Sequence, residues 1–430
     1  MKTRNMRINK QKGLTVSVSQ IKRRLDLREE RGTAERVPTD NHTYDGRGGE
    51  IRQMMDFLKR KYMFRFNTVM GYTEYAVKNT QGVFMPLGPR ETKRMTLEVQ
   101  LSGIVVSIKD VRNFLESDLL RCFNPIRQFL DKCEGAWDGK DHIRQLAATL
   151  KCGNEHWADW FYRWFLGMVD QWRRPAGRQY GNSIVPLIIS RQGFCKSTFC
   201  RRILPPELMW GYTDNMLFSE KKQVLQIMSQ FLLVNLDEFN QISPKMQEGF
   251  LKNLLQLPSV KIKRPYGSHV EEMPRLASFV ATSNVATPLC DPTGSRRFIA
   301  VELTEPIDVS RDIDYKQLYA QALAALNSGE RAYFNQEETR LIMESNRRFE
   351  EKSPMEMCFN SMYRPAATNG EGTYMTTSEI FKELKSVYGS IFAAKSLAAF
   401  GRRLRAIPEL KYRMSSRGTE YLVERTDGAK

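Results

Sequence analysis

The stretch Ser190 to Thr198 reads SRQGFCKST, and it follows the short apolar run Ile184 to Ile189, IVPLII. A buried strand, a turn that contains glycine and ends in Lys-Ser-Thr, and then a helix form a cradle for phosphate, because loop amides point toward the anion. In this pattern Lys196 reaches the β- and γ-phosphates of a nucleotide, and Ser197 ligates Mg²⁺. The predicted nucleotide contacts are Gln192, Gly193, Phe194, Cys195, Lys196, Ser197 and Thr198. An ordinary strand followed by a helix capped by Ser197 is the alternative interpretation.

The loop departs from the usual phosphate-binding pattern in two places. When G-x-x-x-x-G-K-[ST] is laid on residues 190 to 197, Ser190 and Cys195 stand at the two glycine positions. Gly193, inside the loop, is the glycine that the stretch retains. The motif alone is therefore moderately specific for a phosphate-binding loop. The choice between the two interpretations depends on motifs further along the chain.

Polar residues end the next two apolar runs along the chain. Phe231 to Phe239 reads FLLVNLDEF, and a buried strand tolerates two adjacent carboxylates only at an exposed end. Asp237 is predicted to hold the Mg²⁺ shell, and Glu238 to orient and deprotonate the attacking water. The run Leu276 to Asn284, LASFVATSN, places Asn284 where it can contact the γ-phosphate or that water.

Two arginines come next in the segment TGSRRF, residues 293 to 298. Such cations can act as an arginine finger, which reaches the nucleotide of a neighbouring subunit. Arg297 is the first choice for this role and Arg296 the second. A salt bridge from one of them to Asp291 is the alternative.

The order of these motifs resembles a superfamily 3 helicase-type AAA+ ATPase, and specifically the virulence-associated protein E family of phages, plasmids and genomic islands. The phrases that carry the resemblance are QGFCKSTFCRRILPPEL, LLVNLDEF, RPYGSHVEEMPRLASFVATSN, DPTGSRRF and the upstream WDGKDHI. It covers roughly residues 50 to 350 and implies an ATP- and Mg²⁺-dependent enzyme that assembles into a ring. The family usually has glycine where this chain has Cys195, which puts ATPase competence in question.

Composition indicates a polyanionic partner. The chain has 430 residues with 66 Lys and Arg against 49 Asp and Glu, a formal net charge of +17. A strongly basic chain of this size favours nucleic acid as the partner. Seven cysteines without a CxxC pair indicate neither a disulfide framework nor a zinc site. The sequence contains no membrane-spanning run and no signal peptide, so we expect a cytoplasmic protein.

The N-terminal part predicts a basic arm and then a helical domain. Residues 1 to 33 hold ten Lys or Arg against three acids, and residues 1 to 50 are interpreted as a flexible arm and linker. Residues 51 to 180 predict a mainly helical lead-in domain with one hairpin at Tyr62 to Val77, and the resemblance implies a collar between subunits. The α/β AAA+ core is expected over residues 181 to 352 and a connector over 353 to 375.

Within the core, the segment Ser259 to Arg275 predicts a basic hairpin. Cations precede the turn Pro265-Tyr266-Gly267, so the hairpin is expected to lift charge and one aromatic ring off the sheet. In a ring this tip faces the pore and tracks a single DNA strand, whereas the alternative is an exposed basic hairpin without a ligand. The predicted contacts are Lys261, Lys263, Arg264 and Tyr266.

Residues 376 to 430 resemble a winged helix domain. A capped amphipathic helix at Thr377 to Tyr388, a basic helix at Ser396 to Ala406 and an alternating segment at Leu410 to Arg425 give the order helix, helix, wing. Such domains bind duplex DNA or dock proteins, and the basic residues favour DNA. The predicted contacts are Arg402, Arg403, Arg405, Arg413 and Arg417.

Together these features predict an ATP-dependent, ring-forming DNA helicase or translocase, a hexamer in the resembled class, for replication of a mobile element. A primase domain is not evident in the first 180 residues, so any priming is expected from a separate partner. The competing prediction is a DNA-binding replication initiator or regulator that keeps the AAA+ fold for assembly and hydrolyses little or no ATP.

Overall fold

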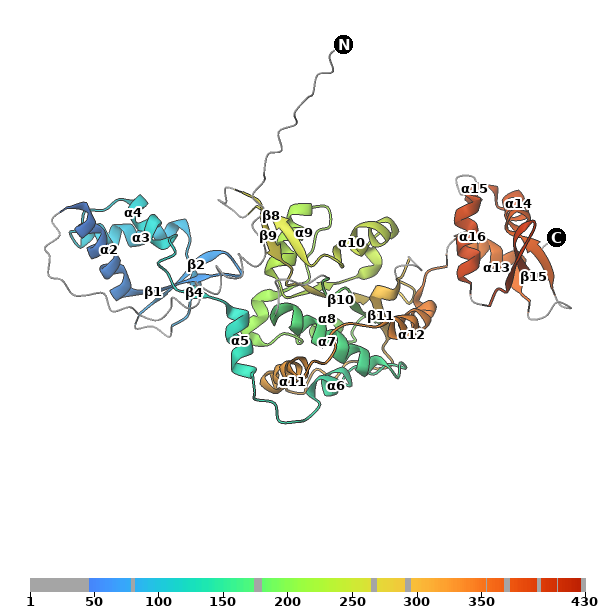
Figure 1. Ribbon diagram of the computed structural model, residues 1–430, viewed down its shortest axis with the longest axis horizontal. Coiled ribbons are helices and arrows are strands. Elements are labelled where there is room, and N and C mark those ends of the chain that lie inside the picture. Colours follow the sequence, from blue (N-terminus) through green and yellow to red (C-terminus); the bar gives the residue numbers. More distant parts are fainter. Residues whose placement is uncertain are drawn as a thin grey trace, which may run out of the picture. The chain divides into compact units, whose positions relative to one another are not determined.

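The computed structural model describes residues 46–78, 82–173, 180–263, 269–290, 295–352, 354–366, 372–392, 396–407 and 409–426 (Figure 1). The chain divides into two compact units, and the first boundary between them falls after Asp131. No helix among the described residues is long and apolar enough to cross a membrane.

In its described residues, the first unit combines a small sheet with the helices α2, α3 and α4 and most of a fourth helix, α5. The sheet has the order β3-β2-β1-β4, in which β1 pairs antiparallel with β2 and parallel with β4. Buried apolar side chains of the helices and of the first two strands form its core. The elements are α2 (Arg47–Lys61), β1 (Tyr62–Asn67), β2 (Tyr72–Val77), β3 (Met85–Pro86), α3 (Pro89–Leu101), α4 (Ile108–Leu115) and β4 (Cys122–Phe123).

The expected hairpin at Tyr62 to Val77 is present as β1 and β2, with Tyr62 opposite Val77. The sequence does not predict the strands β3 and β4, because each is only two residues long and has no alternation to detect. This unit is therefore a mixed helix and sheet domain rather than a mainly helical one. Its end after Asp131 lies well before the predicted boundary at residue 180.

The next three helices are α5 (Pro125–Cys133), which crosses the boundary, α6 (His142–Ala147) and α7 (Trp157–Arg173). Of these, α7 packs on the central sheet, and α6 packs on α7. The aromatic residues of α7 are almost all buried, as expected for core residues rather than a ligand platform. Side chains of α7 donate hydrogen bonds to the backbone beside the sheet: Gln171 Nε2 to Ala277 O at 2.9 Å and Trp172 Nε1 to Leu276 O at 3.2 Å.

The second unit is built on a parallel five-stranded sheet of order β11-β5-β10-β7-β6. Its strands are β5 (Val185–Ile189), β6 (Tyr212–Thr213), β7 (Leu233–Leu236), β10 (Ser278–Ser283) and β11 (Phe298–Glu302). The helices α9 (Lys221–Gln230) and α10 (Lys252–Leu254) lie on one side of it, and α7 and α8 (Lys196–Arg201) lie on the other (Figure 1). The mixed α/β class with a parallel sheet is confirmed.

Shorter helical segments and two long helices complete this unit. They are η1 (Pro206–Gly211), η2 (Phe239–Gln241), η3 (Met246–Leu251), η4 (Ser295–Arg297), α11 (Tyr315–Asn327), α12 (Gln336–Asn346) and η5 (Arg347–Phe349). The packing of α11 against α6 and α7 is reinforced by its Gln317 and Gln321, which bond to the backbone of the segment 136 to 143. That segment contains the WDGKDHI motif, so these hydrogen bonds attach the motif to α11.

The expected basic hairpin is present as the two-stranded pair β8 (Ser259–Ile262) and β9 (Glu271–Pro274). At its base, Arg275 is 1% exposed. Its guanidinium donates to three buried carbonyls that come from different segments: Leu255 O at 2.7 Å, Asn182 O at 2.8 Å and Ala277 O at 2.7 Å. One buried side chain therefore ties the hairpin to the segments that lead into β5 and β10.

The C-terminal domain starts earlier than predicted. The segment expected as a connector, residues 353 to 375, contributes a helix and two strands that pack on or pair with the rest of the domain. The elements are α13 (Pro354–Met362), β12 (Tyr363–Pro365), β13 (Thr373–Thr376), α14 (Thr377–Val387), α15 (Gly389–Phe392), α16 (Leu397–Ala406), β14 (Tyr412–Ser415) and β15 (Gly418–Arg425). The helices α14 and α16 and the final hairpin lie where the sequence predicts them.

Candidate nucleotide site

Three neighbouring parallel strands bring the predicted site residues together. Because β10 lies between β5 and β7, the carboxyl ends of all three strands meet at one edge of the sheet. Lys196 follows β5, Asp237 follows β7 and Asn284 follows β10. This edge is where open parallel sheets bind ligands.

Lys196 is at the centre of the site and is 8% exposed. Its ammonium donates to Asn284 Oδ1 at 2.9 Å, to Ser190 O and Ser190 Oγ at 2.9 Å each, and to Arg191 O at 3.0 Å. Burial lowers the pKa of Lys196 below its ordinary value, while the nearby Asp237 carboxylate raises it. The structure thus places a buried cation between the phosphate loop and the side chain predicted to contact the γ-phosphate.

The predicted Mg²⁺ ligands also lie next to each other. Ser197 Oγ is 3.5 Å from Asp237 Oδ1, and Thr282 Oγ1 donates to the same carboxylate oxygen. Mg²⁺ is usually held by one or two carboxylates together with substrate phosphates. One hydroxyl and one carboxylate, both beside the phosphate loop, fit that requirement. Among the described residues, no group of three or more His, Cys, Asp or Glu could hold a metal ion.

Glu238 is exposed at the end of β7, and its backbone is left-handed, with φ of 49°. Its carboxylate accepts a hydrogen bond from Gln241 Nε2. Left-handed φ is uncommon for residues other than glycine, and such residues cluster at functional sites. Here it turns the chain directly after Asp237, so that two adjacent carboxylates leave the buried strand and reach the surface.

The phosphate loop turns through two left-handed residues. Gly193 has φ of 84°, and Cys195 has φ of 61° and ψ of 24° immediately before α8. Glycine reaches this region without steric cost, whereas a residue with a Cβ atom does not. The backbone therefore has the geometry that the glycine of the motif provides, and Cys195 adopts it under strain.

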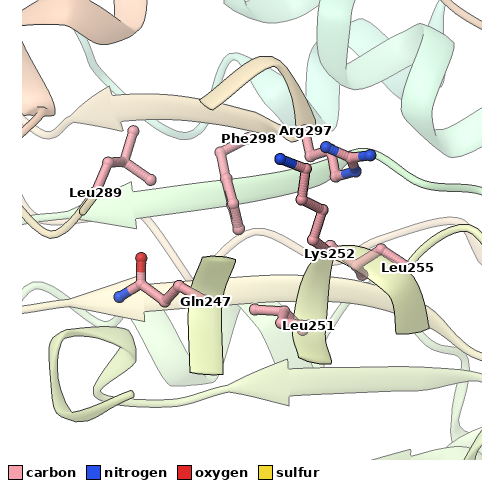
Figure 2. Close-up of a pocket in the computed structure, with 7 residues that line it drawn as sticks. All are labelled: Gln247, Leu251, Lys252, Leu255, Leu289, Arg297 and Phe298. Carbon is pink, nitrogen blue, oxygen red and sulfur yellow. The ribbon is translucent and has the colours of Figure 1, made fainter. Parts of the chain in front are cut away.

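The two finger candidates differ in exposure. Arg297 is 4% exposed and lines a cavity of about 10 Å³ together with Lys252 and Phe298 (Figure 2). Arg296 is exposed to solvent. Both lie in η4, whose position is fixed by Asn346 Nδ2, which donates to Ser295 O and Phe298 O at 2.7 Å each. A side chain that acts on another subunit has to reach the surface, so the geometry favours Arg296 over Arg297. Asp291 lies outside the described residues.

The predicted hairpin contacts are described only in part. Lys261 and Lys263 are both exposed at the end of β8, whereas Arg264 and Tyr266 lie outside the described residues. Two exposed cations at the end of one strand can contact a phosphate backbone. Their role in a pore stays a prediction.

The C-terminal arginines fall into two groups. Arg402, Arg403 and Arg405 lie on α16, while Arg413 and Arg417 form ion pairs with Glu420 at 2.8 and 2.6 Å. Glu420 is 1% exposed and belongs to β15, the strand paired with β14.

Two contributors to the candidate site, Ser190 and Thr282, are not predicted from the sequence. Ser190 accepts a hydrogen bond from Lys196 through its hydroxyl, and Thr282 holds Asp237. Comparison with the motif shows only that position 190 lacks the expected glycine. The Ser190 hydroxyl oxygen can nevertheless accept a hydrogen bond. Thr282 lies in the run Thr-Ser-Asn at the end of β10. A polar residue inside an otherwise apolar strand is the sequence feature that could have indicated its role.

Comparison with known proteins identifies two family matches. Residues 130–351 match the virulence-associated protein E-like domain family. Residues 352–423 match a domain of unknown function from a B. theta gene description, DUF3874. This second match coincides with the C-terminal domain, which begins at α13. A search of curated proteins found no match.

Solved structures of the NrS-1 C-terminal region are similar at a low level. The apo structure of its residues 305–718 has 11% sequence identity and a TM-score of 0.41, covering 89% of this chain and 100% of that one. An A-form apo structure of the same region has 10% identity and a TM-score of 0.43, covering 88% and 99%. The family assignment does not depend on them, because the first family match spans 222 of the 430 residues, more than half of the chain. The chain belongs to the virulence-associated protein E-like domain family.

Proposed function

We propose that this chain is an ATP-driven DNA translocase or helicase that assembles into a ring, with six subunits as in the resembled AAA+ class, and serves replication of a mobile genetic element. The observation that carries the proposal is the hydrogen bond between Lys196 and Asn284 beside the pair Ser197 and Asp237. These four side chains lie on segments that follow three strands distant in the sequence, and each is of the type that its role in ATP hydrolysis requires.

The proposed reaction is attack of water on the γ-phosphoryl group of ATP. Mg²⁺, held by Ser197 and Asp237, would offset charge on the phosphates. Lys196 supplies a fixed cation at the β- and γ-phosphates, and Asn284 contacts the γ-phosphate or the nucleophile. Glu238 accepts a proton from the attacking water, and its exposed position leaves room for that water.

A neighbouring subunit would complete the site with Arg296. Its side chain is exposed, and a finger supplied in trans makes hydrolysis depend on assembly. The ring, the finger and the single strand in the pore are inferred from the superfamily 3 resemblance. The exposed Lys261 and Lys263 and the formal charge of +17 agree with DNA as the partner.

A second candidate function is a DNA-binding initiator or regulator that binds nucleotide but turns over little of it. The strained Cys195 in the phosphate loop, with φ of 61°, favours this candidate. Nucleotide binding alone does not separate the two candidates, because both require it.

The deciding experiment is steady-state ATP hydrolysis by the purified chain, with and without single-stranded DNA. The Lys196→Ala variant removes the buried cation, and Lys222→Ala removes an exposed lysine from α9 as a matched control. Turnover that rises with DNA, persists in Lys222→Ala and disappears in Lys196→Ala is the expected result. No turnover above the Lys196→Ala level, together with tight DNA binding, would refute the translocase and favour the regulator.

A further inference from the structure

We infer that the C-terminal domain contacts DNA through one face formed by α16 and β14, and that the two arginines of the final hairpin, Arg413 and Arg417, stabilise the domain instead of binding DNA. The α16–β14 face is defined here as Arg402, Arg403, Arg405, Tyr412 and Met414. This inference rests on the proposed function only in taking DNA as the partner.

Both hairpin arginines are engaged inside the domain. Arg413 Nε lies 2.8 Å from one carboxylate oxygen of Glu420, and Arg417 Nη2 lies 2.6 Å from the other. Arg413 also stacks on the ring of Tyr374, with 3.7 Å from its guanidinium carbon to the ring centroid. A buried carboxylate that loses one of two such partners is destabilised, because its charge is no longer compensated. Both arginines therefore stabilise the folded domain.

The arginines of α16 form no such ion pair in the described part of the domain. Phe400 and Leu404 are each 1% exposed and lie one turn apart, so they fix the buried side of the helix. Arg402 and Arg405 are exposed, and Arg403 is partly so. Within the described part of this domain, the ion pairs join other residues, and none involves an α16 arginine. Their charges remain available for phosphate groups.

The strand β14 extends the same face. Arg405 Nη2 donates to Thr419 Oγ1 at 3.0 Å, and Thr419 Oγ1 lies 3.3 Å from Met414 Sδ. The guanidinium of Arg405 also lies 5.5 Å from the centroid of the Tyr412 ring. Side chains alternate along a strand, so Tyr412 and Met414 share one face of β14 while Arg413 points to the other. The cations of α16 and these two side chains thus form a continuous surface.

The chemistry of this surface favours nucleic acid as its occupant. Tyr412 is 52% exposed and Met414 is 71% exposed, beside α16 cations that form no ion pair in the described part of the domain. Phosphate contacts explain the arginines, and stacking on a base or packing on a sugar explains an exposed aromatic ring among them. A nucleic acid offers both chemistries, phosphate and base, along one strand.

The test is DNA binding by the full chain, measured by fluorescence anisotropy at several salt concentrations with a duplex and a single strand. Each arginine that contacts a phosphate contributes a salt slope of about 0.9, so Arg402→Ala and Arg403→Ala should each weaken duplex binding about eight-fold at 0.1 M salt. Tyr412→Ala should weaken binding, and Tyr412→Phe should restore it, because a ring is what stacks.

Arg413→Ala is the matched control, since it removes the same charge from the same domain. It should lower the melting temperature while changing the DNA affinity less than two-fold. Where that variant does not fold, Glu420→Gln replaces it: this change keeps the shape, removes the negative charge that offsets both arginines and should strengthen DNA binding. The inference would be overturned if Arg402→Ala and Arg413→Ala lose the same amount of DNA affinity, or if Glu420→Gln binds DNA more weakly than the unaltered chain.

ATP hydrolysis by the unaltered chain is measured alongside, with and without DNA. Absent hydrolysis in the unaltered chain would refute the proposed ATPase while leaving the binding results interpretable. If the face binds no DNA in any variant comparison but captures an acidic peptide in a charge-dependent manner, the occupant is a protein and the inference fails.

Discussion

Replacing Cys195 by glycine tests whether the phosphate loop is strained. The residue adopts φ of 61° and ψ of 24° directly before α8. A residue with a Cβ atom loses about 1–2 kcal/mol in the left-handed region, because the Cβ approaches the following carbonyl oxygen. Glycine avoids this contact, so Cys195→Gly removes the strain without changing the path of the backbone.

Two opposing effects set the magnitude. Glycine in place of alanine ordinarily destabilises a folded protein by about 0.5–1 kcal/mol, because the unfolded chain gains conformational entropy. At Cys195 the relief of about 1–2 kcal/mol outweighs that loss. We therefore expect Cys195→Gly to be more stable than Cys195→Ala by about 0.5–1 kcal/mol, the reverse of the usual order.

Urea denaturation of the two variants measures this difference directly. Both variants lack the thiol, so their difference reports the backbone alone and not the chemistry of sulfur. ATP binding should persist in Cys195→Gly, because glycine is the residue that the motif carries at this position. If Cys195→Ala is as stable as Cys195→Gly or more so, the left-handed geometry is not a source of strain, and the reasoning fails.

Four other predictions address the site and its supports. Glu238→Gln should bind ATP but slow hydrolysis by about 10²–10⁴-fold, and a normal rate would remove Glu238 from its role as base. Arg296→Ala should abolish hydrolysis by the assembled protein with unchanged stability, whereas Arg297→Ala should lower the melting temperature, since only the second side chain is buried. Arg275→Met should cost about 3–5 kcal/mol in urea denaturation, because each buried carbonyl left without a donor costs about 1–3 kcal/mol; a loss below about 1 kcal/mol would contradict this. Hydrogen bonds from two arginines lower the pKa of Glu420 below its ordinary value of 4.5, so its stabilising effect is complete above that pH and is lost on further acidification; a thermal melt of Glu420→Gln should lack this loss.

The sequence predicts the central sheet and the meeting of the candidate site residues at its edge, because both depend on short-range patterns. An apolar run that ends in polar residues marks a buried strand and its exposed end at once. Lys196, Asp237 and Asn284 each follow such a run, and parallel pairing brings the three ends to one edge. The prediction needed no knowledge of strand order, only that the strands are parallel neighbours.

Features that depend on long-range partners could not be predicted in this way. The strands β3 and β4 are two residues long and exist because β2 and β1 lie beside them. The expected connector becomes part of the C-terminal domain because Tyr363 and Thr373 start strands that pair with β15, opposite Arg425 and Val423, respectively, 62 and 50 residues further along the chain. No local pattern around either residue reveals that pairing.

Prediction of charged surfaces from the sequence has the same limit, as the arginines show. A count along the sequence treats Arg402 and Arg413 alike, and it treats Arg296 and Arg297 alike. The structure separates each pair, since Glu420 binds Arg413 and burial encloses Arg297. A basic residue contributes to the attraction of a polyanion only to the extent that its charge is neither offset nearby nor removed from the surface. The count therefore overstates the charge available to a polyanion, and the α16 arginines, which form no ion pair within the described part of the domain, mark where we propose that DNA binds.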